Sequence, residues 1–124
     1  MYKNTINIAK NRMVLSLKGK AEINELHAWS NDLLSQLKRL KPGFGVVSDI
    51  LECHPASEEG RMVIQETQKK AKELGMGNVV RIVEKSNVVT AMQWQRSSRT
   101  VGYIAAEAHS VAEAEKMLDE MEKK

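Results

Sequence analysis

The most constraining feature of the sequence is an apolar segment, Phe44–Ile50, with two adjacent valines and no regular alternation of apolar and polar residues. A strand of this kind is typical of a parallel sheet that is covered by helices on both faces. A helix is predicted soon after it, over Glu58–Leu74, and Gly75 ends that helix. In open α/β sheets, ligands and partners meet the carboxyl ends of the strands, where the free N–H groups of helix N-termini also lie. The junction between this strand and this helix is therefore the predicted functional region.

The rest of the chain supplies the elements that such a sheet needs. The predicted elements are a hairpin over Thr5–Ala9 and Met13–Leu17 with its turn at Lys10–Arg12, a helix over Ala21–Leu40, a strand over Asn78–Val83, a helix over Val88–Ser98, a strand over Tyr103–Ala106 and a helix after Ser110. The order β-β-α-β-α-β-α-β-α predicts a single α/β domain over 1–124. We expect a mixed, mostly parallel sheet of about five strands with four helices.

Periodicity and capping residues predict which side chains are buried and where the helices begin. Ile6, Ile8, Met13, Leu15 and Leu17 should share one buried face of the hairpin. The predicted inward residues of the long helices are Ile23, Leu26, Trp29, Leu33, Leu37, Leu40, Ile64, Thr67, Ala71 and Leu74, while Gln68 and the lysines beside it should face outward. Ser57, Ser86 or Asn87, and Ser110 are predicted helix caps, the last of them in a capping box with Glu113.

Length and composition limit the classes of protein to which the chain can belong. A chain of 124 residues with 42% hydrophobic and 28% charged residues is expected to fold as one globular domain with an aliphatic core, because aromatics make up only 4%. Its single cysteine, Cys53, cannot form an internal disulfide. No stretch approaches eighteen apolar residues, and no signal peptide follows Met1, so we predict a cytoplasmic protein without a transmembrane segment.

Charge is distributed unevenly along the chain. Residues 1–20 hold five Lys or Arg and no acid, within a net charge of +3. A modest basic excess is typical of a solvated surface, so nucleic-acid binding is not expected. Residues 49–60 show the opposite bias, with Asp49, Glu52, Glu58 and Glu59 and no base. This acidic segment coincides with the predicted functional junction.

The same junction resembles a known family. The element order is similar to that of the STAS domain of bacterial anti-sigma-factor antagonists, in which a strand ending in Asp leads to an Asp-Ser-Ser-Gly turn that opens the second helix. Asp49 ends the strand here, Gly60 stands at the family's glycine, and Ser57-Glu58-Glu59 stand where the family has Asp-Ser-Ser. The segment His109–Glu115 is also similar to the closing helix of the family.

The resemblance implies a regulatory role with one departure. In the family, the second Ser of the turn is the phosphoacceptor that controls binding to a kinase-like anti-sigma factor, and Glu59 occupies that position here. A glutamate is permanently charged and cannot be phosphorylated by such a kinase. The switch is therefore locked, or has moved to Ser57, or this chain binds something else. The predicted partner-binding residues are Asp49, Ser57, Glu58, Glu59, Gly60, Trp94 and Arg96.

Local physics offers a simpler interpretation of the turn. Ser57 is a good N-cap, which contributes about 0.5–2 kcal/mol, and Glu58 and Glu59 in the first turn favour the helix dipole. Phosphorylation of Ser57 would place nearly two more negative charges beside two carboxylates, so its effect on a partner is expected to be large and repulsive. The glutamates also argue against a phosphate-bearing ligand at this helix start.

Catalytic and metal-binding interpretations have little support in the sequence. Cys53-His54 could form a nucleophile pair, but adjacent residues on an extended segment point to opposite sides. The four acids of residues 49–60 could hold Mg²⁺, although no Asp-rich loop with regular ligand spacing is present. His27 and His109 are isolated. We therefore expect no enzymatic activity, no cofactor and no metal.

Trp94 has two interpretations that the sequence leaves open. If Val89 and Met92 face the core, Trp94 is partly exposed beside Arg96 and would be a binding hot spot. If the helix is rolled the other way, it buries Val88, Ala91 and Trp94.

The sequence thus predicts a non-enzymatic, STAS-like regulatory module that engages a protein partner through residues 57–60 and the helix after Val88. The alternative is a carrier that binds a lipid or another small apolar ligand in a cavity of the same fold. The oligomeric state stays open, with a homodimer among the options.

Overall fold

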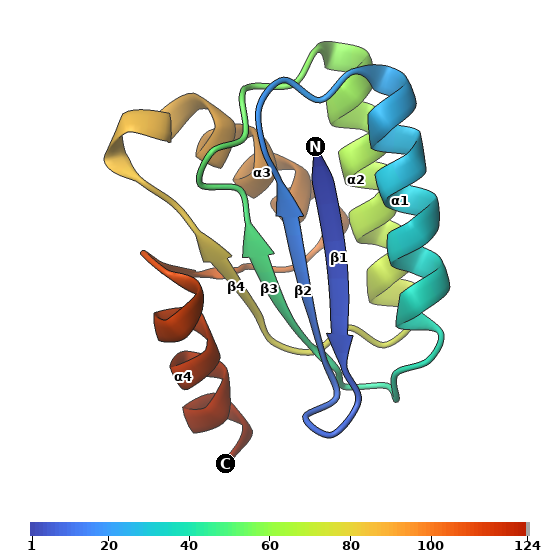
Figure 1. Ribbon diagram of the computed structural model, residues 1–124, viewed down its shortest axis with the longest axis vertical. Helices are drawn as coiled ribbons and strands as arrows, with labels where there is room; N and C mark the ends of the chain where they lie inside the picture. Colours follow the sequence, from blue (N-terminus) through green and yellow to red (C-terminus); the bar gives the residue numbers. More distant parts are fainter. Residues whose placement is uncertain (124) are drawn as a thin grey trace.

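The computed structural model describes residues 1–123 and has the predicted α/β fold (Figure 1). Its elements are β1 (Tyr2–Asn7), β2 (Arg12–Leu17), α1 (Ile23–Leu37), β3 (Gly45–Asp49), α2 (Glu58–Glu73), β4 (Val79–Ile82), the 3₁₀ helix η1 (Lys85–Asn87), α3 (Val88–Val101), β5 (Ala106–Ala108) and α4 (Val111–Glu122). The described part of the chain therefore contains five strands in one mixed sheet and four α-helices, which confirms the predicted fold class.

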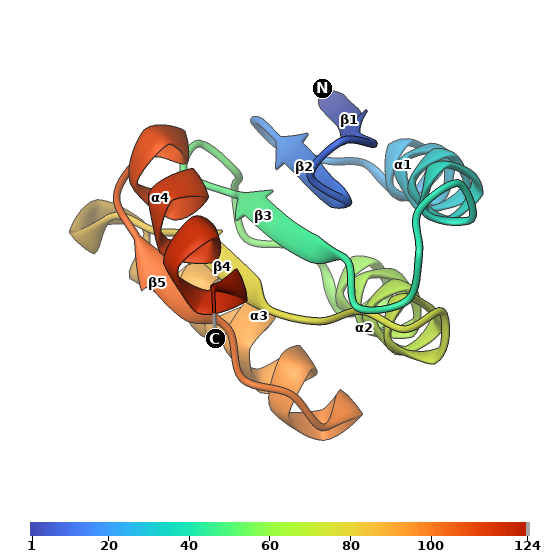
Figure 2. The ribbon, with the colours of Figure 1, turned by 90° about the horizontal axis from the view of Figure 1, so that it is seen from below.

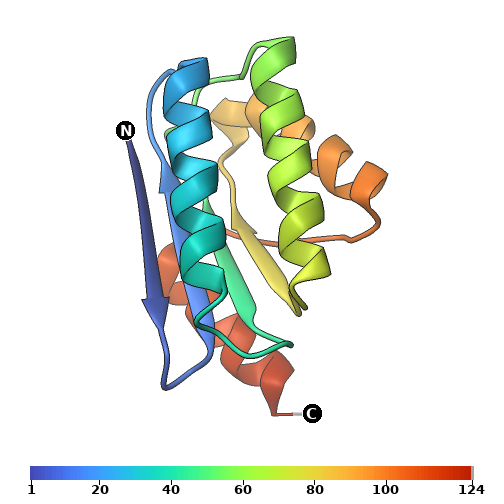
Figure 3. The same ribbon diagram turned by 90° about the vertical axis from the view of Figure 1, so that its right-hand side faces the viewer.

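The strands lie in the sheet in the order in which they occur in the chain, β1-β2-β3-β4-β5. β1 and β2 are antiparallel, and every later neighbour is parallel. Each helical crossover therefore moves the chain by one strand in the same direction. As a result, α1, α2 and α3 cover one face of the sheet and α4 covers the other (Figure 2). α1 and α2 run side by side across the first face (Figure 3).

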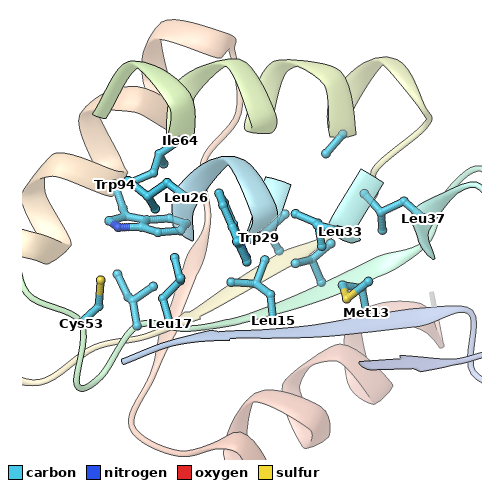
Figure 4. Packing of buried hydrophobic residues seen from close by; sticks show 14 of the residues in the cluster. Met13, Leu15, Leu17, Leu26, Trp29, Leu33, Leu37, Cys53, Ile64 and Trp94 are labelled. Atoms are coloured by element: carbon cyan, nitrogen blue, oxygen red, sulfur yellow. The ribbon is translucent and has the colours of Figure 1, made fainter. Parts of the chain in front are cut away.

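The core on the first face is formed by large side chains from α1, the strands and α3 (Figure 4). Leu26, Trp29, Leu33 and Leu37 recur at helical spacing on α1 and are buried, as predicted. The rings of Trp29 and Trp94 pack edge to face with centroids 5.8 Å apart, a geometry that adds to their burial energy. Two helices of this face are thereby joined through aromatic side chains.

The core on the second face is smaller. It contains Val47, Val80, Ile82, Ala108, Ala114 and Leu118, all buried. Val46 belongs to the first core and Val47 to the second, so β3 is covered on both faces, as its sequence predicts. Beside this core, the guanidinium of Arg12, only 1% exposed, reaches α4 and pairs with Glu115 at 2.9 Å, Asp119 at 3.0 Å and Glu122 at 2.8 Å.

Three local predictions were wrong. The hairpin turn is Ile8–Asn11 rather than 10–12, so Ile8 lies in the turn and is exposed, while Arg12 begins β2. Gln68 was expected to face outward but is buried, because its amide donates to Ser98 Oγ on α3 at 3.2 Å. The fifth strand is 106–108 rather than 103–106, since α3 runs on to Val101 and Gly102 ends it with a φ of 108°.

Among the described residues, no helix combines the length and the apolar character needed to span a membrane. The buried face of each helix is instead accounted for by packing against the sheet or against another helix.

Candidate functional site

The start of α2 lies beyond the carboxyl end of β3, on the face that α1, α2 and α3 cover (Figure 1 and Figure 3). Ser57 is its N-cap, and the Ser57 Oγ accepts a hydrogen bond from the backbone N–H of Gly60 at 3.0 Å. The predicted cap is therefore confirmed. Glu58 and Glu59 follow in the first turn, where their negative charge favours the helix dipole.

Gly60 is buried where the first turn of α2 packs against α1. A Cβ at this position would lie 2.8 Å from Leu26 Cδ1 and 3.2 Å from Ser57 Oγ. Any side chain here would push the two helices apart or disturb the cap. Packing against α1 is thus sufficient to explain glycine at this position.

Glu58 is engaged in a two-point ion pair on its own helix. Arg61 Nη2 lies 2.6 Å from Glu58 Oε1, and Arg61 Nε donates to Oε2 at 3.3 Å. The hydrogen bond from Arg61 lowers the pKa of Glu58 below its usual value, and the charge of Arg96 on α3 acts in the same direction. The charge of Arg96 on α3 therefore acts on the first turn of α2.

Glu59 is exposed and forms no ion pair within the described residues. Its side chain lines an open groove between α1 and α2, together with His27, Met62 and Lys70. The position that resembles the family's phosphoacceptor is accordingly free to meet another molecule.

The loop that precedes α2 is fixed to α3 by side chains that sequence reasoning did not identify. Gln93 uses both ends of its amide, accepting from Ala56 N at 2.8 Å and donating to Ala56 O at 3.0 Å. Thr90 donates to Cys53 O at 2.9 Å, and Asn87 donates to the same carbonyl at 2.8 Å. The spacing of these three residues on α3 places them on one side of the helix. Asn87 was predicted to cap its own helix, and instead it binds this loop.

The interpretation of Trp94 as an exposed partner contact was wrong. Trp94 is 3% exposed and packs between Trp29 and the guanidinium of Arg81, whose Cζ lies 5.9 Å from the centre of the ring. The buried side of α3 consists of Thr90, Trp94, Ser97 and Ser98, which recur at helical spacing. Sequence reasoning missed this stripe because three of its four members are small polar residues.

The orientation of α3 that buries Trp94 leaves apolar residues exposed on the opposite side of the helix. Val89 is 60% exposed and Met92 is 54% exposed, although both were considered for the core. Arg96 is also exposed, and its spacing from these two residues places all three on one face of α3. We call Val89, Met92 and Arg96 the outer face of α3. The loop-binding residue Gln93 lies next to this face in sequence.

Asp49 is not brought together with residues 57–60. Side chains alternate along β3, and Val47 faces the second core, so Asp49 also points to the α4 side of the sheet. Its carboxylate accepts from Leu51 N at 3.3 Å. Asp49 therefore supports the turn after β3, while Ser57, Glu58 and Glu59 lie on the opposite face.

The catalytic and metal interpretations gain no support from the geometry. Cys53 is buried, its thiol donates to the His54 carbonyl at 3.4 Å, and burial raises its pKa to about 11. Such a thiol is protonated at neutral pH and is a poor nucleophile. The part of the chain that the structure describes brings no three His, Cys, Asp or Glu side chains into an arrangement that could hold a metal ion.

A cavity of about 30 Å³ lies inside the first core. Leu33, Leu37 and Val79 line its apolar part, whereas Ser48 and Gln68 contribute polar side chains. A volume of this size is enough for one or two water molecules.

Comparison with known proteins adds no family assignment. No protein-family model matches this chain, and no curated protein matches its sequence. The resemblance to the STAS domain therefore stays a prediction from the sequence, based on the order of the expected elements and on the residues between Asp49 and Gly60.

Proposed function

We propose that this chain is a non-enzymatic, STAS-like regulatory module that binds a protein partner through the start of α2 and the outer face of α3. The observation that carries the proposal is the position of exposed Val89 and Met92 on a helix tied to the loop before α2. Exposed apolar side chains rimmed by charged groups are typical of protein-binding surfaces. The nearby charges are those of Arg96 and Glu58.

The rigidity of this region supports a binding role. Six hydrogen bonds made by the side chains of Asn87, Thr90 and Gln93 hold the backbone of this loop. Their partners are Ile50 O, Leu51 O, Cys53 O, which accepts two, and both polar groups of Ala56. A surface that is already ordered before binding loses less conformational entropy when the partner docks. The proposed surface thus presents a fixed shape to its partner.

Glu59 has a defined place in the proposal. Its unpaired carboxylate provides a permanent negative charge at the position that resembles the phosphoacceptor, so the module stays in one binding state. Ser57 is less suited to be a switch, because its hydroxyl already caps α2. A kinase-like anti-sigma factor is the partner class that the resemblance implies. A cytoplasmic location and a homodimer remain predictions.

The test is a titration of a partner recovered by pull-down against the wild type, Glu59→Ser and Ser57→Asp. Glu59→Ser should change the free energy of unfolding by about 0.3–1 kcal/mol, since it removes one charge from a helix terminus. Its effect on the binding free energy should reach about 2 kcal/mol, because the charge lies in a contact from which water is excluded.

A matched control is Glu73→Ser, at the opposite end of α2, where the side chain is also exposed. This variant should leave the affinity unchanged. Equal affinities of the wild type, Glu59→Ser and Ser57→Asp would exclude the start of α2 from the binding surface. A second arm, Met92→Asp, should weaken binding without a comparable loss of stability, because Met92 is exposed on α3.

The carrier function has less support. A lipid or drug-sized ligand needs a pocket of roughly 300–1,000 Å³, and the cavity of the first core measures about 30 Å³. Native mass spectrometry of freshly purified protein separates the two functions, because a carrier would retain a bound lipid and a regulatory module would not.

A further inference from the structure

A positive charge is buried without an acidic partner between the sheet and α3. Arg81 lies in the middle of β4 and is 3% exposed. Its Nη2 donates to Ser98 Oγ at 2.6 Å, and its Cζ lies 5.9 Å from the centre of the Trp94 ring. Within residues 1–123, no carboxylate oxygen comes within 4.0 Å of this guanidinium. Its neighbour on β5, Glu107, is exposed.

An uncompensated guanidinium in this position is costly. Removal of a charge from water costs several kcal/mol unless an opposite charge or a complete set of hydrogen bonds replaces the hydration. Arg81 lacks such a set, because its buried Nε has no hydrogen-bond partner. Burial lowers the pKa of Arg81, but an arginine side chain remains charged at neutral pH. The site therefore favours the arrival of a negative charge.

Several residues that line the cavity of the first core also adjoin Arg81 or its partner Ser98. Ser48 lines the cavity and lies opposite Arg81 in the pairing of β3 with β4. The Ser48 Oγ is buried and has no hydrogen-bond partner among the described residues. Gln68, a second lining residue, donates to the same Ser98 Oγ as Arg81, at 3.2 Å, and its Oε1 is also unpartnered. Trp94 and Tyr103 also line the cavity. We call Ser48, Gln68, Arg81 and Ser98 the Arg81 cluster.

We propose that the Arg81 cluster binds a small monovalent anion of halide size. The anion would accept hydrogen bonds from Arg81 Nε and Ser48 Oγ, two buried donors of the cluster that have no partner among the described residues. A neutral water would satisfy these donors but would leave the charge of Arg81 uncompensated. The cavity of about 30 Å³ admits one small ion, and it excludes larger organic anions.

Thermal unfolding in two sodium salts of equal ionic strength tests this site. Bromide fits the cavity and gluconate does not, so bromide should raise the Tm of the wild type in a saturable way. At about ten times its Kd, the anion should shift the Tm upward by roughly 4–8 °C, because it binds the folded state alone. Arg81→Met should lose this shift, whereas Arg99→Met, which removes an exposed arginine of α3, should retain it.

If Arg81→Met fails to fold, the isosteric variant Gln68→Glu still tests the site. Gln68→Glu places a carboxylate near the same Ser98 oxygen as the guanidinium. This variant should have a higher Tm than the wild type in gluconate and should no longer respond to bromide. General salt effects are shared by all variants, so the difference between them reports the site.

Crystals grown with bromide provide the direct measurement. An anomalous peak within hydrogen-bonding distance of Arg81 Nε and Ser48 Oγ would support the site. The inference would be overturned by the absence of a peak there, or by equal bromide shifts in the wild type, Gln68→Glu and every folded Arg81 variant.

Discussion

On one face of the sheet, fifteen buried residues of the described chain pack beneath α1, α2 and α3, whereas α4 covers six on the other face. The first group contains two tryptophans and five leucines, and the second contains small aliphatic side chains with one leucine. The second face compensates with charge, since Arg12 pairs with three carboxylates of α4. The two faces should therefore respond differently to the loss of a methylene group, to salt and to pH.

The largest expected effect is that of a cavity in the first core. Leu33→Ala should lower the free energy of unfolding by about 2–5 kcal/mol, because a side chain that is buried among large neighbours leaves a space that cannot collapse. Leu118→Ala on the second face is the matched variant, and it should fall at the lower end of the same range. Urea unfolding of both proteins measures the difference. A loss below about 0.5 kcal/mol for Leu33→Ala is typical of surface positions and would remove Leu33 from the core.

A smaller effect is expected from the charged contact of the second face. Arg12→Met should cost about 1–3 kcal/mol, since it removes hydrogen bonds to charged groups and leaves three carboxylates near one another. The carboxylates are about a third exposed or more, which keeps the cost below that of a fully buried pair. The deficit should shrink in 1 M salt, where Leu33→Ala is insensitive. Lys10→Met, which removes an exposed cation beside Asp119, is the control and should cost less than about 1 kcal/mol.

The caps of α2 and α4 allow the two faces to be compared at the starts of their helices. Ser57 Oγ accepts from Gly60 N at 3.0 Å, and Ser110 Oγ accepts from Glu113 N at 3.1 Å. Ser57→Ala and Ser110→Ala should each cost about 0.5–2 kcal/mol, because both leave one helix N–H without a partner. Exposed Ser35 in the middle of α1 provides the control, Ser35→Ala, with a change within about 0.5 kcal/mol. Unequal caps would show that the difference between the faces extends to the helix starts.

The smallest expected effect is the pH dependence that Asp119 contributes on the second face. Hydrogen bonds from Lys10 and then Arg12 lower the pKa of Asp119. A carboxylate whose folded pKa lies below its unfolded value of about 3.9 stabilises the protein above that pH, and the contribution disappears as pH falls through the lowered value. Unfolding free energies measured between pH 5 and pH 2 should therefore fall less steeply in Asp119→Asn than in the wild type. Glu120→Gln removes an exposed carboxylate of the same helix and should leave the slope unchanged.

The features that were predicted from sequence are those that neighbouring residues determine. The order of elements, the burial of β3 on both faces and the caps at Ser57 and Ser110 all follow from short patterns, and the structure confirms them. The Glu113 carboxylate differs in one detail, since it accepts from His109 N at 3.3 Å and so binds one residue before the cap. Its effect on the helix start is local in either case.

The features that were missed depend on partners far away in sequence. Gln68, Arg81 and Ser98 are polar, and polarity alone favours an exposed position, yet all three are buried because Ser98 Oγ accepts hydrogen bonds from both Gln68 and Arg81. The orientation of α3 follows from the same contacts, together with those of Asn87, Thr90 and Gln93 to the loop before α2. A pattern based on apolar residues therefore left the orientation of α3 open, and Trp94 was included among the predicted partner-binding residues although it is buried.

The contact between Arg12 and α4 also affects the order in which the protein can fold during synthesis. The carboxylates that pair with Arg12 follow it by 103 to 110 residues. A ribosome adds about 5–20 residues per second, so the partners of Arg12 emerge roughly 5–20 s after the β1–β2 hairpin. Throughout that interval, the nascent chain can build the sheet strand by strand, because each new strand joins the one made just before it. The guanidinium at the start of β2 must remain hydrated until α4 arrives, which makes closure of the second face the late step of folding on the ribosome.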